Sequence, residues 1–295
     1  MMQNGVCRKR RRLEGMDVFS AAVLTVFVLL IAFPFYTSLV TSFTTSTSYA
    51  QNPVQLIPQS FTWENYTYMW ERLDIATGYK NTLFVVVFGT VFSMFISLTF
   101  AYGLHMRNYL GKKAAFLYLM ITMYFGGGMI PTYMLMRDLG LINNPVSILL
   151  MCGVSPFNIV IIKNAFDGLP PSLSEAARVS GANEWQIFRH IALPLCMPTV
   201  VTFSLFIAVG YWNEWFWSML LLTRPAVKTL QIMLRSIVTT VETMEMDSAA
   251  SDYYEVFSQG LKMAAVIMTM LPIMVVYPFL QKYFAKGILI GAVKM

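Results

Sequence analysis

The stretch SLSEAARVSGANEWQIFRHIALPLCMP, from Ser172 to Pro198, interrupts a chain that is otherwise strongly apolar. Its charged and titratable residues are Glu175, Arg178, Glu184, Arg189 and His190. Proline precedes it, glycine divides it and proline ends it, a pattern that predicts two short helices. Apolar runs lie on both sides of this polar stretch. The first question about function is therefore what the polar stretch contacts.

The composition is typical of a membrane protein. Apolar residues make up 57% of the chain and charged residues 12%, against about a quarter charged in a typical soluble domain. Since this deficit comes with long uncharged runs, we expect a multi-pass, all-α membrane protein. The formal net charge is +6, and its placement along the chain says more about topology than about nucleic acid, which we do not expect as a partner.

Few residues are available for metal or nucleophilic chemistry. The three cysteines, Cys7, Cys152 and Cys196, are scattered and form no C-x-x-C pair. The two histidines, His105 and His190, are far apart in sequence. This pattern predicts neither a disulfide framework nor a metal or catalytic cluster.

Six apolar stretches are long enough to be membrane spans, which need about twenty residues each. The basic N-terminus followed by an apolar run resembles a signal peptide. That run is too long for a usual signal peptide and no clear cleavage site follows it, so we interpret it as a retained first span. The predicted spans are Val18–Ser42, Thr82–Leu104, Ala114–Met136, Val146–Ile162, Met197–Leu222 and Met263–Leu280.

The basic residues predict the orientation of these spans. With the N-terminus inside, 14 of the 21 Lys and Arg fall on inner segments. The positive-inside rule therefore places residues 1–17, the hairpin 170–195 and the tail 282–295 in the cytoplasm. Of the outer loops, the first contains an aromatic segment suited to the membrane interface. The third, Thr223–Leu261, contains a possible interfacial helix and then an acidic part that we expect to be a solvated loop.

The predicted spans contain one clear ionisable residue, Glu214, in the sequence GYWNEWFW. Its carboxylate faces a wet cavity or a neighbouring subunit, or else it lines a solute path suited to sugars, and both interpretations remain open. The candidate path residues are Tyr211, Trp212, Asn213, Glu214 and Trp215. The chain has no P-loop, so another chain must supply the energy for any uphill transport.

The polar stretch carries helix signals at both ends of each half. Ser172 with Glu175 predicts a capping box, and Gly181 predicts the end of the first helix. Asn183 with Gln186 predicts a second start, and Pro194 is expected to close the second helix. The second helix is expected to place Trp185, Phe188 and Ala192 on one side. The hairpin would dock a protein or lie on lipid, while a DNA-binding role is disfavoured because both ends are tied to the membrane.

These residues resemble a known signature. The match consists of Glu175-Ala176-Ala177, Gly181-Ala182, Ile191, Leu193 and Pro194, which resemble the EAA motif of permease subunits of binding-protein-dependent ABC importers. The departure is Ser180, where the family usually has aspartate. Segments such as YFGGGMIPTY and TLQIMLR resemble the second permease of carbohydrate importers, in the branch for complex polysaccharides and oligosaccharides, with alginate importers as one candidate group.

The resemblance implies a fold, partners and roles. It implies the type I importer fold over residues 18–295, in the bacterial inner membrane. It implies a second related permease, two ATPase subunits that carry ATP and magnesium, an extracytoplasmic solute-binding protein and a saccharide. This chain would hold no cofactor and would not be an enzyme. The residues implied in coupling to the ATPase are Ser172, Glu175, Ala176, Ala177, Gly181, Ala182, Ile191, Leu193 and Pro194, and those implied in binding-protein contact are Glu242, Glu245 and Asp247.

Two alternatives remain at this point. The same architecture serves other small polar solutes, such as glycerol phosphate. An anionic solute would favour Lys or Arg in the spans, where we find none, and alginate meets the same objection. The other alternative is a channel or carrier that works without an ATPase.

Overall fold

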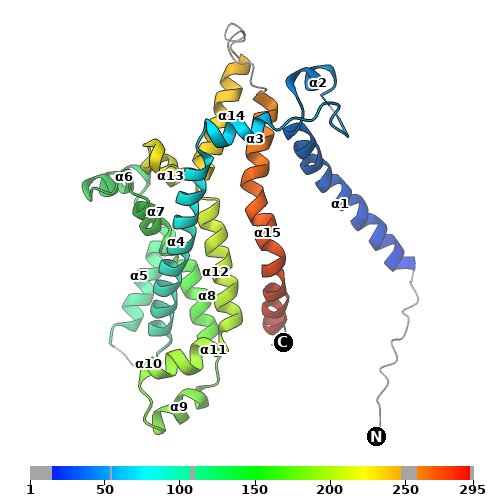
Figure 1. The fold of residues 1–295 in the computed structure, drawn as a ribbon. Coiled ribbons are helices and arrows are strands. Elements are labelled where there is room, and N and C mark those ends of the chain that lie inside the picture. Colours follow the sequence, from blue (N-terminus) through cyan, green and yellow to red (C-terminus); the bar gives the residue numbers. More distant parts are fainter. Residues whose placement is uncertain (1–14, 54, 107–109, 247–257, 293–295) are drawn as a thin grey trace.

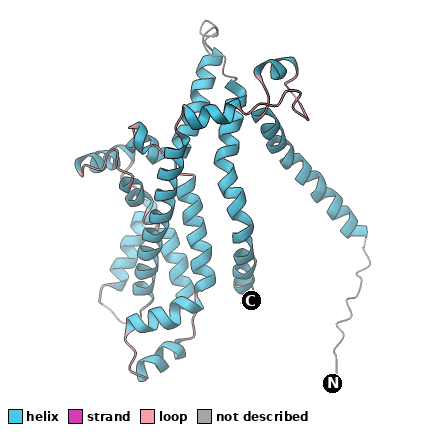
Figure 2. Cartoon of the chain, viewed as in Figure 1, coloured by secondary structure: helices cyan, strands magenta, loops and turns pink. Residues whose placement is uncertain are grey.

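A computed structural model describes residues 15–53, 55–106, 110–246 and 258–292. These residues form helices joined by loops, as predicted, and Figure 2 shows no strand among them. The one β-bridge of the described part pairs Thr44 with Phe61. In chain order the helices are α1 (Gly15–Ser42), α2 (Ser46–Gln51), α3 (Glu64–Glu71), α4 (Ile75–His105), α5 (Lys112–Tyr124), α6 (Met129–Asp138), α7 (Val146–Cys152), α8 (Pro156–Asp167), α9 (Pro171–Val179), α10 (Glu184–Ile187), the π-helix η1 (Phe188–Ala192), α11 (Leu193–Leu195), α12 (Met197–Trp212), α13 (Phe216–Leu221), the 3₁₀-helix η2 (Pro225–Val227), α14 (Leu230–Met246) and α15 (Ser258–Ala292).

Among the described residues, three single helices are long and apolar enough to cross a membrane, within α1, α4 and α15. The expected span 82–104 lies within α4, which begins at Ile75 instead of residue 82 and has 31 residues. At about 1.5 Å per residue this length exceeds the ~30 Å hydrocarbon core of a bilayer. The first outer loop is therefore shorter than the sequence predicts.

The other expected spans are not straight helices. The predicted span 114–136 consists of α5 and α6, which are bent by 113°, and 146–162 falls on α7 and α8, bent by 58°. Residues 213–215 divide the predicted span 197–222 into α12 and α13. Glycines 126–128 and Pro156 explain two of these breaks, because they interrupt or restart helical backbone. The segment 184–195 and α12 form a third bent pair, at 81°, and the count of possible spans reaches six if each pair is one span.

Helix α4 lies at the centre of the bundle and packs against α7, α8, α12 and α14 (Figure 1). The core along it is apolar and includes Val85, Met94, Ile159, Phe166 and Ile207, all of them buried. Within a bilayer the lipid is as apolar as these side chains, so their close packing, more than their removal from water, holds the helices together.

Helices α4 and α12 approach closely at Gly89. A Cβ atom at this position would lie 2.6–2.8 Å from three ring atoms of Tyr211. The hydroxyl of Tyr211 is held in turn by Ser93, at 2.9 Å, and donates to the carbonyl oxygen of Leu149 at 3.1 Å. Glycine at residue 89 therefore sets the separation of these two helices.

Asn143, in the loop between α6 and α7, holds the segment that follows α13. The side-chain oxygen of Asn143 accepts hydrogen bonds from the backbone N–H groups of Thr223 and Arg224, both at 2.8 Å, and from the Thr223 hydroxyl at 2.9 Å. Its own N–H donates to the carbonyl of Leu221 at 2.7 Å. Asn143 has a φ of +61°, a conformation that asparagine tolerates better than most residues. The sequence analysis missed this clamp, since its partners lie far away in the chain.

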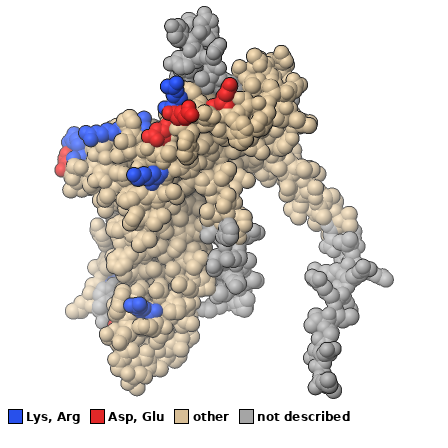
Figure 3. Space-filling model, viewed as in Figure 1, with Lys and Arg blue, Asp and Glu red and all other residues tan. Residues whose placement is uncertain are grey.

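Helix α1 leans away from the bundle (Figure 1). From residues 18 to 36 its side chains are exposed, and burial begins only at its last turn, with Val40 and Ser42. On the face drawn in Figure 3, most of the Lys, Arg, Asp and Glu lie at the end that carries α3 and α13, and one basic side chain lies on the otherwise uncharged surface nearer the other end. The exposed apolar side chains of α1 suit contact with lipid or another membrane subunit.

Candidate functional site

The hairpin 170–195 begins with proline and not with a capping box. Pro170 is the N-cap residue of α9, with a ψ of 126°, and Pro171 is the first helical residue, with no side-chain cap present. The predicted Ser172–Glu175 capping box is therefore wrong. Proline suits this first position because its fixed φ matches the helix and its missing N–H would be unpaired there anyway. Ser172 and Glu175 both lie inside the helix, with exposed side chains.

The first helix ends at Gly181, as predicted. Gly181 has a φ of +86°, a left-handed conformation that glycine adopts without steric cost. The N–H of Gly181 donates to Arg178 and that of Ala182 to Ala177, each at 3.0 Å. These two bonds make up a Schellman motif, which pairs the last carbonyls of the helix and reverses the chain.

The second helix starts with the predicted capping box. The Asn183 side chain accepts from the Gln186 N–H and the Gln186 side chain from the Asn183 N–H, both at 2.8 Å. Pro194, however, does not close this helix, which continues through η1 and α11 to Leu195. The wider π turn explains the error: Leu193 bonds to Phe188, five residues back, and this spacing accommodates a proline that would clash in a regular α-helix.

The two halves of the hairpin differ in burial. No residue of α9 is buried, whereas Ile187, Phe188 and Ala192 are buried against the bundle. Trp185 was expected to share that packed side but is 57% exposed. The other signature residues are distributed between these surfaces, with Ala176, Gly181 and Pro194 exposed and Ala177, Ala182, Ile191 and Leu193 half-buried.

Polar contacts through Glu184 join the hairpin to α4. Arg178 Nε donates to Glu184 Oε1 at 2.8 Å, across the turn. The Tyr102 hydroxyl, at the end of α4, donates to Glu184 Oε2 at 3.2 Å. The hydrogen bond from Arg178 lowers the pKa of the Glu184 carboxyl, and the same bond raises the pKa of Arg178. The sequence contains no local signal for the role of Tyr102, which is 82 residues from Glu184.

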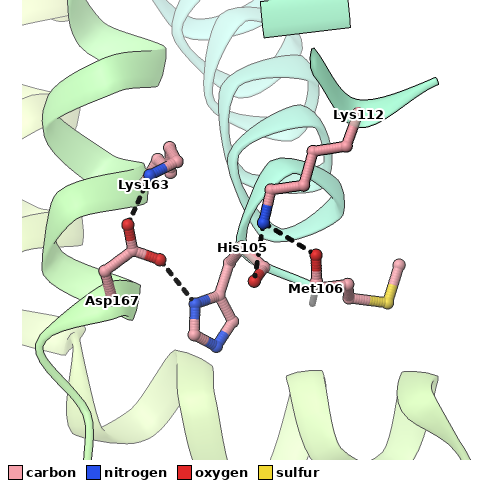
Figure 4. A network of polar contacts seen from close by, with 5 residues as sticks. All are labelled: His105, Met106, Lys112, Lys163 and Asp167. Atoms are coloured by element: carbon pink, nitrogen blue, oxygen red, sulfur yellow. Dashed lines mark hydrogen bonds and ion pairs between the residues drawn. The ribbon is translucent and has the colours of Figure 1, made fainter. Parts of the chain in front are cut away.

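Beneath the hairpin, polar residues tie three helix ends together (Figure 4). His105 Nδ1 lies 2.8 Å from Asp167 Oδ1, and Lys163 forms an ion pair with the same carboxylate. Lys112 Nζ donates to the carbonyl of Met106 at 2.9 Å. These contacts surround a recess of about 300 Å³ that α9 borders through Glu175 and Arg178. The helix ends therefore form a connected base on which the hairpin rests.

The five candidate path residues do not share one surface. Tyr211 and Trp212 are buried, while Asn213 and Trp215 are exposed at the break between α12 and α13. Glu214 Oε1 accepts from the backbone N–H of Trp217 at 2.7 Å. Its carboxylate thus satisfies an unpaired donor at the start of α13, a structural use that neither earlier interpretation of Glu214 included.

This geometry predicts how substitutions at Glu214 behave. Glu214→Gln keeps an oxygen acceptor for Trp217 and is expected to leave the yield and thermal stability of the purified protein nearly unchanged. Glu214→Ala leaves the donor unpaired and is expected to cost about 1–2 kcal/mol, as loss of a helix cap does. Thermal unfolding in detergent measures the difference. Equal destabilisation by both variants would show that the charge itself is needed.

The residues expected to contact a binding protein fall largely outside what can be described. Glu242 and Glu245 belong to α14, which continues to Met246. The first part of the segment expected to be a solvated loop is therefore helical. The side chains of Glu242 and Glu245 and all of Asp247 lie outside the described residues.

Residues 114–290 match the family described as binding-protein-dependent transport system inner membrane component. The chain belongs to this family. The matched region covers α5 to most of α15, including the whole hairpin, so the family relationship rests on the site described above.

Two curated relatives agree with this assignment. The permease is 37% identical over 279 residues to a polygalacturonan/rhamnogalacturonan transport system permease protein of Bacillus subtilis (strain 168), covering 94% of this chain and 98% of the relative. It is 28% identical to an arabinooligosaccharides transport system permease protein of Halalkalibacterium halodurans, covering 89% and 91%. Both relatives are transport components, so the permease belongs among membrane transport subunits.

A solved structure has the same fold. A chain of a bacterial ABC transporter involved in the import of the acidic polysaccharide alginate superposes with a TM-score of 0.82 at 31% identity, covering 91% of the permease and 96% of that chain. The permease therefore has the type I importer fold expected from the EAA-like motif.

Proposed function

We propose that this permease forms half of the translocation path of an ATP-driven importer for an oligosaccharide or polysaccharide. A solute-binding protein delivers the saccharide, a second related permease forms the other half of the path, and two ATPase subunits hold ATP and magnesium. The names of its relatives support a carbohydrate substrate. They do not identify which saccharide this chain transports.

The exposed helix α9 is the observation that supports coupling to an ATPase. None of its residues is buried, and Val179 is 90% exposed. A helix held by one turn motif and one polar contact at the tip of a bundle is suited to receive another protein. Small residues such as Ala176 and Ala177 allow that protein to approach closely, while Leu193 and Pro194 lead into the 81° bend that joins this segment to α12. Rotation of the ATPases would then move the hairpin and α12 together.

Reconstitution of the whole importer tests this function. The permease, its partner permease, the ATPase subunits and the binding protein are placed in liposomes, and uptake of acidic and neutral trisaccharides is followed. We expect uptake that requires both ATP and the binding protein. A matched complex whose ATPase lacks its catalytic carboxylate is expected to show none. Uptake that is equal without ATP would favour a channel or carrier instead.

The proposed orientation has six spans with both termini in the cytoplasm. It is supported by the basic residues and by Figure 1, in which α1 begins and α15 ends toward the end of the molecule that carries α9. In this arrangement residues 1–17 precede the transmembrane domain 18–295, and the tail 282–295 faces the ATPases. Single cysteines at positions 64 and 178 test it with a membrane-impermeant thiol reagent. Labelling of position 178 from outside intact cells would contradict the orientation.

The acidic segment is proposed to contact the binding protein through Glu242, Glu245 and Asp247. The support is the position of α14, which carries Glu242 and Glu245 and lies at the end of the molecule opposite α9 (Figure 1). Deletion of residues 242–255 provides the test. Full stimulation of ATP hydrolysis by the binding protein in that variant would exclude the contact.

A further inference from the structure

The guanidinium group of Arg235 lies over the ring of Trp215, with 4.0 Å between Arg235 Cζ and the ring centroid. Arg235 projects from α14, and Trp215 lies in the break between α12 and α13. Arg235 is exposed and Trp215 is 37% exposed. This cation is therefore brought beside the candidate path by tertiary packing, although the predicted spans themselves contain no Lys or Arg.

The segment of chain that carries this pair is basic in sequence. Residues 215–241 include Arg224, Lys228 and Arg235 and no Asp or Glu. The preceding acid, Glu214, accepts a hydrogen bond from Trp217. Among the side chains that the structure describes, no carboxylate is paired with Arg235. The pair thus presents a cation whose charge is not neutralised by a described neighbour.

Stacking leaves the binding capacity of Arg235 available. A guanidinium that lies flat on an aromatic ring keeps its N–H donors in the plane of the group, where they bind a carboxylate in bidentate geometry. The indole also restricts the motion of the arginine, which lowers the entropy cost of binding. Phe216 lies beside Trp215 with its ring perpendicular to the indole and 5.7 Å between the ring centroids, and exposed aromatic rings can stack on sugar faces.

The pair lies at the end of the molecule opposite the hairpin. The N–H of Leu230, at the start of α14, donates to Thr82 Oγ1 at 2.9 Å, so α14 begins beside the first third of α4. The hairpin instead contacts Tyr102, near the other end of α4. Figure 1 shows α13 and α14 far from α9. In the proposed orientation, this is the end at which a saccharide arrives.

We propose that Arg235, held on Trp215, binds the carboxylate of a uronate residue in an acidic oligosaccharide as it enters the path. The proposal rests on the proposed function and deepens it, because it assigns the substrate class and a residue that determines it. It also answers the earlier objection to an anionic solute. The competing explanation is that the pair only fixes α14 to the α12–α13 break.

The test uses the complete reconstituted importer and two uronate trisaccharides, trigalacturonate and trimannuronate, each compared with its methyl ester. The ester keeps the sugar rings and removes the negative charge. Arg235→Gln is expected to reduce uptake of the acid forms about tenfold or more, the range expected for loss of a charged hydrogen bond. Uptake of the esters is expected to change by less than about twofold. Arg235→Lys keeps the positive charge but loses the bidentate geometry of the guanidinium, so its uptake of the acid forms is expected to lie between those of the wild type and Arg235→Gln.

Arg224→Gln is the matched control, since it removes an exposed arginine from the same region without touching Trp215, and it is expected to leave all uptake rates unchanged. Equal loss of acid and ester uptake in Arg235→Gln would overturn the proposal in favour of a structural pair. Unchanged acid uptake would overturn it as well. A wild-type complex without ATP-dependent uptake of any of these sugars would instead overturn the proposed function on which the inference rests.

Discussion

Replacing Gly181 with valine is expected to lower ATP-dependent uptake at least about tenfold while leaving membrane insertion intact. The backbone at Gly181 has a φ of +86°, and a β-branched residue is strongly disfavoured there. The two backbone bonds of the Schellman motif depend on this conformation. If the motif is lost, α9 no longer has a fixed direction relative to α10, and movement of the ATPases is absorbed by the turn.

The matched variant is Gly181→Asn, because asparagine tolerates a positive φ. An added Cβ at this position meets no atom within 4 Å in this chain, so neither variant creates an internal clash. Preserved uptake in Gly181→Asn, with loss in Gly181→Val, would identify backbone conformation as the requirement. Loss in both would indicate that the ATPase itself approaches Gly181. Normal uptake with valine would contradict the coupling role of the hairpin.

Gly89→Val is expected to destabilise the transmembrane bundle by about 1–3 kcal/mol, the usual cost of overpacking. The new Cβ would lie 2.6–2.8 Å from the Tyr211 ring, and the Tyr211 hydroxyl is held by both Ser93 and Leu149. The ring therefore cannot turn aside without breaking these contacts, and α4 must separate from α12. The expected results are a lower yield of monodisperse protein and an apparent Tm reduced by several degrees in detergent.

Gly103→Val is the control for this prediction. Gly103 lies in the same helix, and a Cβ there would meet no atom within 4 Å. Both variants add the same side chain to α4 and change helix propensity alike, so a difference between them reports the contact with Tyr211. Equal stability of the two proteins would show that α4 and α12 are not closely packed at Gly89.

Much of the site was predictable because its signals are local. Gly181 and the Asn183–Gln186 capping box form their bonds within a few residues, so the pattern of residue types predicts the backbone directly. The errors were local as well: Pro171 started α9 where a serine cap was expected, and the π turn let the second helix continue through Pro194. The family relationship followed from the same stretch, since the EAA-like spacing lies entirely within the hairpin.

Hydropathy and charge by themselves determined that this is an all-α membrane protein with a polar hairpin between apolar segments. The transfer of a segment into lipid depends on its length and composition, and a helix pairs its own backbone groups there. Only the tertiary structure decided where the apolar segments bend, that Tyr102 holds Glu184, that Glu214 caps α13, and that Arg235 lies on Trp215. These contacts join residues on different helices or across breaks, and their existence depends on how the helices pack. A sequence pattern records which side chains are present, whereas packing determines which of them meet.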